Sequence, residues 1–575
     1  MGLFCCRRLM PSFRVANLVS PFWLVFWSAG LSWCWLLPNH YPPWSAFHMD
    51  AWSATMYLPL AAAVLWLTRA DTRLSGPALL ILVLLAVPWL QFAFGLIPSP
   101  GTAWISFSYL LGFGLAMIVG QRWEFASPAQ VGDGLFLAIG IAAFASVGLQ
   151  LHQWLQLNLI HLWSMGNGYG RPFANFGQPN QLGTLLLWSL LALGWGAWRV
   201  KIRPTVAVLA MVFVLFGLAL TGSRTAWIGL LGLTAGVWYW RRLWPWSATP
   251  RVVMGLLACF VCFVWIVPVL TDALLLGSAE GEIEALTRVA SELRPQIWAI
   301  LVDAALQQPW SGYGWNQVAT AHLAGAPGYP ALKFVFAHAH NLFLDLVLWN
   351  GIPLGLILSA LVIGWFCTRF LAVREAGSAM LLLLVAVAAN HAMLELPLHY
   401  AYFLLPVGLV AGALESRLGW RLVNFGQRWL GAALWFTSAA MLALLVRDYM
   451  RVEASYQVLR FEWANIQTNA SREPPDVILL DQLRDVIALS RFEPTQDISA
   501  EDLMRLRHTA ALYPSAAVIH KLAVALVWKQ QAEEAVVWLR RLCAVVPATS
   551  CQAVKTSWEN LAKTDPLVGK VPWPN

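Results

Sequence analysis

Long apolar runs separated by short polar segments dominate the first 446 residues of the chain. A membrane-spanning helix needs about 20 mostly apolar residues, because the hydrocarbon core is about 30 Å thick and a helix rises about 1.5 Å per residue. The pattern therefore predicts an all-α polytopic membrane protein. About 13 runs approach this length (range 11–14), near residues 21–37, 52–67, 76–97, 104–120, 131–150, 181–198, 204–220, 225–240, 252–271, 341–364, 378–394, 401–414 and 429–446.

Positive charges fall mainly in one set of alternate loops. That set holds 17 residues, namely Arg7, Arg8, Arg14, Arg69, Arg73, Arg122, Arg199, Lys201, Arg203, Arg241, Arg242, Arg251, Arg369, Arg374, Arg417, Arg421 and Arg428. The opposite set holds five, namely Arg171, Arg224, Arg288, Arg294 and Lys333. The positive-inside rule predicts a cytoplasmic N-terminus. With an odd number of spans, residues after Arg447 lie outside, which in a bacterium is the periplasmic side of the inner membrane.

Composition agrees with a membrane protein, because 59% of the residues are hydrophobic and only 11% are charged, against about 25% charged in soluble domains. The net charge of +8 comes from short loops between apolar runs. We therefore expect membrane lipids, and no nucleic acid, as partners. No small-residue cleavage site follows the run at 21–37, so we expect it to be an uncleaved first span.

Two polar regions stand out from this pattern: an external loop, 272–340, and the tail, 447–575. A loop of that length more often forms a binding site or lid than a simple connection. We therefore expect two domains: a membrane domain at 1–446, including the loop, and a periplasmic helical domain at 447–575. Within the tail, Ala523, Ala532 and Ala535 have the spacing of one tetratricopeptide unit, and a generic helical bundle fits equally well.

The tail also contains Cys543 and Cys551, eight residues apart. A disulfide between them is expected in an oxidising compartment. The alternative is a pair of unpaired structural thiols. The other six cysteines lie in or beside apolar runs and are typical of small packing residues.

The stretch FAHAHNLFLDLVLWNGIPLGL places His338 and His340 just before an apolar run. Metal ligands on a helix favour i,i+3 or i,i+4 spacing, and no Cys or carboxylate cluster accompanies this pair, so no metal site is expected. One neutral imidazole is suited to accept a proton from a hydroxyl as a general base. The alternative is a hydrogen-bonded structural histidine at a helix N-terminus.

External arginines oppose the positive-inside bias. Arg224, in TGSRTAW, lies at the junction of two spans, and EALTRVASELRPQIW contains Arg288 and Arg294. An arginine at this depth must meet an anion or reach the headgroups, and its planar fork suits phosphate. Several of them together favour a binding site for an anionic headgroup or a pyrophosphate.

Two further external corners are rich in polar groups. The first, RPFANFGQPNQLGTLL, carries Arg171, Asn175, Gln178, Asn180 and Gln181, which is more amide than turn chemistry requires. Such amides can bind sugar hydroxyls or phosphate.

The second corner, ELPLHYAYFLLP, carries Glu395, His399, Tyr400 and Tyr402. The tyrosines are also typical of an aromatic belt. Glu395 needs a cation at this depth, such as Arg294 or a protonated histidine.

These motifs together carry a resemblance to a known family. HAHN followed by a span with NGIPLG resembles the O-antigen ligase and polymerase superfamily. RPFANFGQPNQLGTLL and PNHYPPWSAFH resemble the bacterial protein O-oligosaccharyltransferases, the pilin-glycosylation ligases of PglL type, and ELPLHYAYFLLPVGLVAG and the helical tail are similar to that group too. The resemblance extends from about residue 21 to 550.

The resemblance implies an activity: transfer of an oligosaccharide from undecaprenyl pyrophosphate to Ser or Thr hydroxyls of periplasmic, pilin-like proteins. It implies that His340 activates the hydroxyl or orients the leaving group. Arg224 and Arg294, with Arg288 as a third, would stabilise the pyrophosphate, so that no metal or other cofactor is needed. Relatives often have Tyr after the glutamate, where this chain has Leu396, and Tyr400 or Tyr402 could substitute for it.

Arg171, Gln178, Asn180, His338 and Glu395 are expected to support the site or bind substrate. An O-antigen ligase acting on lipid A core, or a polymerase, would use the same donor chemistry. The amide-rich corner and the polar tail favour a protein acceptor. A transporter is disfavoured because no internal repeat is visible and the ionisable groups cluster at one face.

Overall fold

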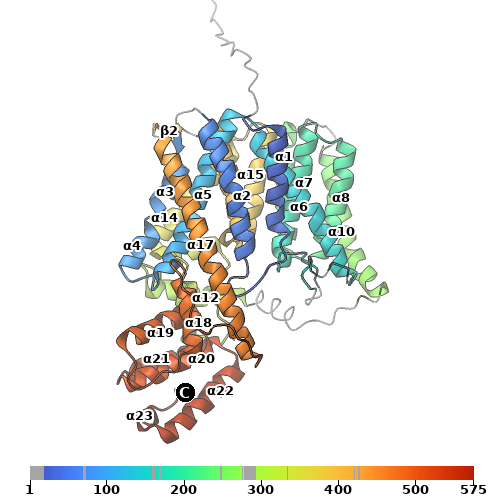
Figure 1. Cartoon of the computed structure of the whole chain (residues 1–575). Helices are drawn as coiled ribbons and strands as arrows, with labels where there is room; N and C mark the ends of the chain where they lie inside the picture. The colour runs from blue at the N-terminus through green and yellow to red at the C-terminus, as the bar shows by residue number, and fades with distance from the viewer. Residues whose placement is uncertain are drawn as a thin grey trace, which may run out of the picture.

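The structure is a computed structural model, which describes residues 18–68, 73–157, 159–160, 162–166, 171–245, 249–274, 276, 293–332, 334–419, 421–424 and 428–574. Helices dominate it, and each predicted apolar run coincides with helix (Figure 1). The first part contains α1 (Pro21–Ser32), α2 (Phe47–Leu67), α3 (Gly76–Leu84), α4 (Val87–Ala93), α5 (Pro100–Ala126), α6 (Gln130–Trp154), α7 (Pro179–Trp198), α8 (Pro204–Leu220), α9 (Arg224–Tyr239), α10 (Thr249–Ala273), α12 (Arg294–Gln307), α13 (Val318–Gly325), α14 (Leu342–Ala372), α15 (Ala376–Ala392), α16 (Ala401–Leu418) and α17 (Arg428–Trp463).

Seven helical segments of the described chain are long and apolar enough to cross a membrane: Gly76–Ala93, Pro100–Ala126, Gln130–Trp154, Pro250–Ala273, Leu342–Ala372, Ala401–Leu418 and Trp429–Trp463. The chain is therefore a multi-pass helical membrane protein. The remaining predicted spans are helices that are shorter or less apolar, and the number 13 stays a prediction. The only departure from all-α structure in the described chain is a short antiparallel pair, β1 (Arg73–Ser75) with β2 (Arg421–Asn424).

Local sequence sets the helix starts. The hydroxyl of Ser99 accepts a hydrogen bond from the Gly101 amide, and Pro100 follows it as the first residue of α5. Ser223 caps α9 in the same way through the Ala226 amide. Asn341 caps α14 by accepting from the Phe343 and Leu344 amides. These caps satisfy amides that have no partner within the helix, so each helix begins at a defined residue.

Small residues hold α5 against α16. A Cβ atom on Gly120 would lie 1.9 Å from the Leu409 carbonyl oxygen, and one on Gly412 would lie 1.9 Å from that of Met117. Only glycine permits backbones to approach this closely, as is common between membrane helices. The contact fixes α16, whose N-terminus follows directly after the Glu395 corner.

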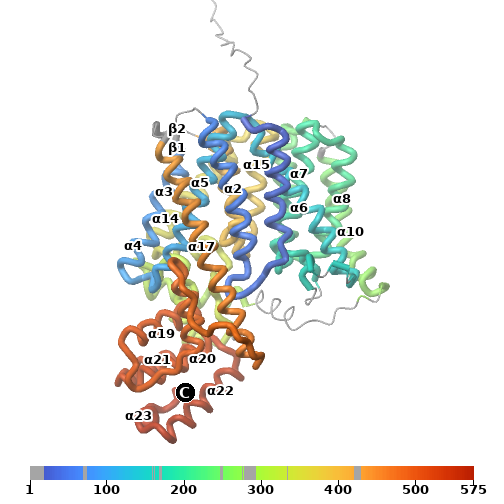
Figure 2. The backbone as a smooth tube through the Cα atoms, in the orientation of Figure 1, coloured from blue at the N-terminus to red at the C-terminus, as the bar shows by residue number. Residues whose placement is uncertain are grey.

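α17 leaves the bundle and continues into the C-terminal part without a break at residue 446 (Figure 2). That part contains α18 (Asp481–Arg491), α19 (Ala500–Leu512), α20 (Ala516–Trp528), α21 (Ala532–Val545), α22 (Ala548–Thr564) and α23 (Pro566–Gly569). Ala523 and Ala535 are buried in its core, whereas Ala532 is half-buried. The tetratricopeptide assignment stays a prediction. The expected disulfide between Cys543 and Cys551 is confirmed.

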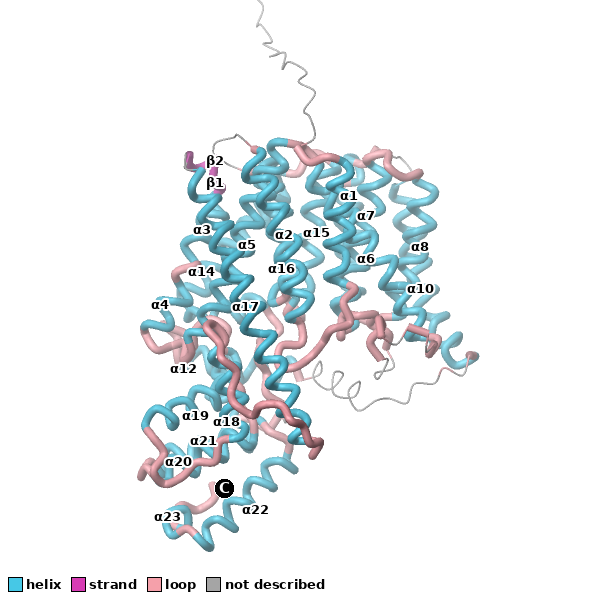
Figure 3. Tube along the Cα trace, in the orientation of Figure 1, coloured by secondary structure: helices cyan, strands magenta, loops and turns pink. Residues whose placement is uncertain are grey.

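The C-terminal helices are attached to one end of the bundle. Asp481 accepts hydrogen bonds from the Gly101 amide at 2.7 Å and the Ser99 hydroxyl at 3.0 Å. Leu323 and Ala326, from α13 and the turn after it, belong to the same apolar core as α19–α22. Loops gather between the bundle and these helices (Figure 3), and the contacts of Asp481, Leu323 and Ala326 connect the two parts.

Candidate active site

A three-residue ionic cluster lies at the loop-rich end of the bundle. One oxygen of Glu395, Oε1, accepts a hydrogen bond from Arg294 Nη2, and the other, Oε2, lies 2.9 Å from His340 Nδ1. The Glu395 side chain is 7% exposed, whereas those of Arg294 and His340 are 19% and 22% exposed. The predicted cationic partner of Glu395 is therefore present as both an arginine and a histidine, with one face of each open to the exterior.

Each member of the cluster sits at a helix end. Arg294 is the first residue of α12, and Glu395 follows α15, its amide bonded to the His391 carbonyl at 2.8 Å. His340 immediately precedes the cap Asn341 and has φ of 52°. This left-handed conformation is unfavourable for a residue with a Cβ, so surrounding contacts hold the histidine against a local preference. Such strain is common at functional sites.

Electrostatics define the state of the cluster. Burial raises the pKa of the Glu395 carboxyl, but the hydrogen bond from His340 and the charges of His340 and Arg294 outweigh it, so that the net pKa lies below its usual range. Glu395 is therefore a carboxylate at neutral pH. A carboxylate only accepts hydrogen bonds, so Nδ1 of His340 must carry the proton. The lone pair of a neutral His340 is then on Nε2, which is free to accept a proton.

The amide-rich corner forms a second layer behind Glu395. Asn180 Nδ2 donates to Glu395 Oε1 at 3.2 Å, and Ser223 Oγ donates to Asn180 Oδ1 at 2.6 Å. The next residue after Ser223 is Arg224, and Arg171 Nε donates to the Thr221 carbonyl at 2.9 Å in the same turn. The structure thus brings Arg171, Asn180 and Arg224 together at the end of the bundle that carries Glu395.

Arg224 is the most accessible cation of this group. Its side chain is exposed, and in the described residues it makes no hydrogen bond or ion pair. Arg294 is also positive and is already paired with Glu395 on one side. Arg288 lies outside the described residues. The site therefore has an exposed guanidinium and a partly neutralised one, both suited to an anionic ligand.

Other members of the amide-rich corner are used internally. Asn175 is fully buried: its Nδ2 donates to the Leu36 and Trp163 carbonyls, and its Oδ1 accepts from the Met165 amide. Its amide group therefore holds loops together and, being buried, is not accessible to a sugar.

Gln178 accepts from Gln181 Nε2 at 3.2 Å, and Gln181 Oε1 accepts from the Tyr402 hydroxyl at 2.8 Å. Tyr402 is 1% exposed and stacks on Tyr400. Burial raises the pKa of Tyr400 to about 12, so this hydroxyl stays protonated. Gln181 and the two tyrosines therefore interact with one another, and the buried Tyr402 cannot contact a ligand at the surface.

His338 does not join the cluster. Its ring lies 4.1 Å from that of His399, centroid to centroid, and His399 Nε2 lies 3.7 Å from Asp345 Oδ2. Burial, with His399 and His340 nearby, lowers the pKa of His338 well below its usual value. Asp345 Oδ1 accepts from the Ala339 amide at 2.9 Å. His338 is thus neutral, and Asp345 pins the backbone beside His340.

Three contributors were missed from sequence: Ser223, His391 and Asp50. The His391 Nδ1 atom lies 2.7 Å from Thr184 Oγ1, one helical turn before Glu395. Asp50 Oδ1 accepts from the Ala401 amide at 2.6 Å, so a residue of α2 caps α16. His391, in NHAML, and Asp50, in FHMD, are ionisable residues beside apolar runs. Burying an ionisable group at such a position is costly, and this cost is the sequence signal that could have identified both residues.

In the described residues, no group of three or more His, Cys, Asp or Glu side chains is placed so that it could hold a metal ion. The cluster instead combines a basic imidazole nitrogen with positive charge nearby. This arrangement can take a proton from a hydroxyl and stabilise negative charge developing on a leaving group.

Three profiles of known protein families match the chain. The profile described as O-Antigen ligase matches residues 209–359, which include Arg224, Arg294 and His340. The profile described as Protein glycosylation ligase matches 172–195, and that described as Virulence factor membrane-bound polymerase, C-terminal, matches 379–560, which includes Glu395.

The chain is 29% identical over 528 residues to the general O-oligosaccharyltransferase of Acinetobacter baylyi (strain ATCC 33305 / BD413 / ADP1), covering 89% of this chain and 91% of that protein. PglL-type O-oligosaccharyltransferases are therefore the proteins that this chain resembles over most of its length.

A second relative from the same strain, named ComP-specific O-oligosaccharyltransferase, is 31% identical over 249 residues, 43% of this chain and 44% of that one. The family resemblance drawn from sequence motifs is thus confirmed. Arg294 and His340 lie in the part of the chain matched by one profile and Glu395 in the part matched by another, so the fold assembles the cluster from distant segments.

Proposed function

We propose that this protein transfers an oligosaccharide en bloc from undecaprenyl pyrophosphate to Ser or Thr hydroxyls of periplasmic proteins such as pilins, at the outer face of the bacterial inner membrane. The observation that carries the proposal is the Arg294–Glu395–His340 cluster beside the exposed Arg224. The names of both relatives support an oligosaccharide as the transferred group and a protein as acceptor.

Each residue has a part in the proposed reaction. Glu395 holds the Nδ1 proton of His340, and Nε2 takes the proton of the acceptor hydroxyl. The hydroxyl oxygen attacks C1 of the first sugar, and the bond between C1 and the pyrophosphate oxygen breaks. Arg224 and Arg294 stabilise the negative charge on the departing polyprenyl pyrophosphate. The positioned charges act in place of a metal ion.

The related glycan-transfer activities differ in the class of acceptor that they use. An O-antigen ligase would use lipid A core, and a polymerase would use another lipid-linked glycan, with the same donor chemistry. The C-terminal helices stand directly beside the cluster end of the bundle (Figure 1), which supports a protein acceptor because a folded surface there can dock one. The relatives are named general and ComP-specific, so their names support either a broad or a narrow acceptor range.

The test supplies cells with one lipid-linked glycan and offers both a pilin and lipid A core. A mass increase of the pilin equal to the whole glycan, dependent on this enzyme, is the expected result. Glycan on lipid A core with an unmodified pilin would assign the ligase activity instead. Longer lipid-linked glycans with both acceptors unmodified would assign the polymerase.

A further inference from the structure

An apolar cavity lies within the bundle, away from the ionic cluster. Its volume is about 320 Å³, and it is lined by residues of α7, α8, α9 and α10, by Trp244 and by Met380 of α15. Aliphatic side chains form nearly all of its wall, including Leu191, Met211, Leu230, Leu233 and Leu256. The one indole in the wall, Trp244, has its N–H bonded to the Val237 carbonyl at 2.9 Å. The described wall therefore offers almost nothing to a polar ligand.

A cavity of this size has room for part of a ligand. Protein interiors are packed like organic crystals, with few voids larger than a water molecule. Water needs two to four polar partners to occupy a cavity stably, and this wall supplies almost none. Apolar chain is the chemistry that fits.

The cavity shares two helices with the candidate site. α7 begins at Pro179, next to Asn180, and α9 begins at Arg224, while Leu191 and Leu230 further along these helices line the cavity. Leu230 and Val237 follow Arg224 by six and 13 residues, which is roughly 9 Å and roughly 20 Å along the helix. Half of a hydrocarbon core is about 15 Å, so the cavity extends beyond the bilayer midplane as seen from Arg224.

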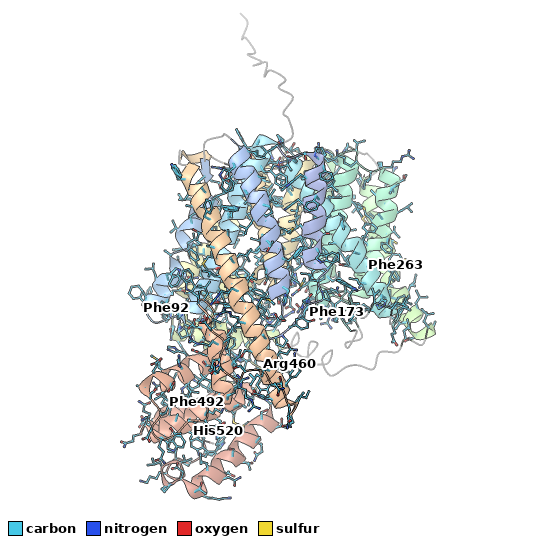
Figure 4. The ribbon with its side chains drawn as sticks, viewed as in Figure 1. Phe92, Phe173, Phe263, Arg460, Phe492 and His520 are labelled. Carbon is cyan, nitrogen blue, oxygen red and sulfur yellow. A yellow bond between two sulfur atoms is a disulfide. The ribbon has the colours of Figure 1, made fainter. Side chains whose placement is uncertain are left out.

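α10 closes the cavity on the lipid side. It is a peripheral helix, since only 6% of its most apolar stretch is buried, and its residue Phe263 lies near the outer edge of the bundle (Figure 4). Val252, Val253 and Leu256 line the cavity while Met254 is exposed. The cavity is therefore covered by a single layer of helix, next to the lipid from which a donor arrives.

We propose that this cavity holds distal isoprenoid units of the polyprenyl donor and so selects for a long chain. The inference rests on the proposed function, because it assumes that a pyrophosphate is anchored near Arg224. An ordinary acyl chain anchored at that end stops near the midplane, whereas a polyprenyl chain is long enough to pass it. The bilayer is itself apolar, so the gain comes from close packing in the cavity and is moderate.

Gly194 offers a clean perturbation. It lies in α7 on the cavity wall, and a Cβ there would meet only the Met380 sulfur, at 3.8 Å. Gly194→Leu places a branched side chain in the cavity without a backbone clash. Gly148 in α6 is exposed, with nothing within 4 Å of its Cβ position. Gly148→Leu is therefore the matched control, the same change at an exposed helix position that does not line this cavity.

The experiment measures Kd of purified full-length protein in nanodiscs for undecaprenyl pyrophosphate and for farnesyl pyrophosphate, which share a headgroup. Wild type should bind the long chain more tightly. Gly194→Leu should weaken undecaprenyl pyrophosphate about tenfold, or about 1.4 kcal/mol, and leave farnesyl pyrophosphate unchanged. Gly148→Leu should change neither value, and thermal unfolding of both variants checks folding.

Two results would overturn the proposal. Gly194→Leu could weaken both pyrophosphates equally or neither, or wild type could bind both chain lengths equally while Gly194→Leu lowers the amount of copurified phospholipid. The second result would assign the cavity to a bulk lipid. Failure of the proposed function looks different, since wild type would then bind neither pyrophosphate, or Arg224→Ala would bind both as wild type does.

Discussion

Glu395→Gln is the most informative single change in the cluster. Glutamine keeps the shape of the side chain but removes its charge and replaces one acceptor oxygen with a donor. Glu395 accepts from Arg294 on one oxygen and from His340 on the other. The variant can accept from only one of them, so either Arg294 loses its partner or His340 loses the acceptor that fixes its tautomer.

The size of the effect follows from burial and charge. A hydrogen bond to a charged group contributes about 1.5–3 kcal/mol, and removing one partner from a fully buried pair costs about 3–5 kcal/mol. Arg294 and His340 are partly exposed, at 19% and 22%, so water compensates in part and the lower figure applies. We expect kcat to fall by about 10- to 100-fold, at about 1.4 kcal/mol per factor of ten.

Glu415→Gln is the matched control. Glu415 is also buried and paired, with Arg369 Nε at 2.7 Å, but it lies at the far end of α16. Its loss should lower the unfolding temperature and leave kcat unchanged in the folded fraction. The assay is transfer from a lipid-linked donor to a purified acceptor, with thermal unfolding of each variant in parallel. Glu395→Gln activity within threefold of wild type, or an equal loss in Glu415→Gln, would refute the reasoning.

The pH dependence of stability gives an independent reading. The pKa of Glu395 is lowered in the folded protein, so its contribution to stability is fully present above the unfolded pKa of about 4.5. It is lost as pH falls through the lowered folded value. The difference in unfolding temperature between wild type and Glu395→Gln should therefore be constant near neutrality and shrink below about pH 4.5. A difference that grows on acidification would contradict the assigned charge state.

Three further predictions concern single features. Arg224→Ala should raise KM for the donor about tenfold with unchanged unfolding temperature, because the side chain is exposed, whereas Arg294→Ala should lower both activity and stability. Asp50→Ala should remove the cap of α16 and lower kcat together with roughly 1–2 kcal/mol of stability, measured by chemical denaturation. Cys543→Ser should cost roughly 2–3 kcal/mol in the C-terminal helices, and Cys543 and Cys551 should resist thiol labelling until reduced.

Each of these has its own control. Arg242→Ala changes an exposed arginine at the opposite end of the bundle and should leave KM unchanged, and an equal rise in KM would remove the role of Arg224. Asp50→Asn keeps an acceptor for the Ala401 amide and should restore most of the kcat lost in Asp50→Ala, so no restoration would argue against a positioning role. Immediate labelling of Cys543 without reductant would show that the bond is absent in solution.

Most of the fold that could be predicted from the sequence followed from the positions of the apolar runs. Each apolar run is helical, because an uninterrupted backbone hydrogen-bond network is required in lipid. Helix ends beyond the apolar core are set by other contacts. α17 continues to Trp463, where Asp448 accepts from the Ile478, Leu479 and Leu480 amides, and nothing in the local pattern marks that partnership.

The contacts of the site could be predicted from the sequence where an ionisable group at the membrane edge needs a partner of opposite charge. A carboxylate at the membrane edge requires a cation, which led to the pairing of Glu395 with Arg294. The amides were harder, because a polar turn looks the same whether its groups face a ligand or each other. Asn175 turned inward to three backbone groups, while Asn180 reached Glu395. Only the three-dimensional path of the loops separates these outcomes.

The central claim is that His340 acts as the base that activates the acceptor hydroxyl. The most direct test is single-turnover transfer by purified His340→Ala, with donor binding measured on the same sample and His508→Ala, in the C-terminal helices, as control. Transfer should fall by at least about 100-fold while the Kd for undecaprenyl pyrophosphate stays within threefold and His508→Ala remains active. Transfer at the wild-type rate by a folded His340→Ala protein would contradict the claim.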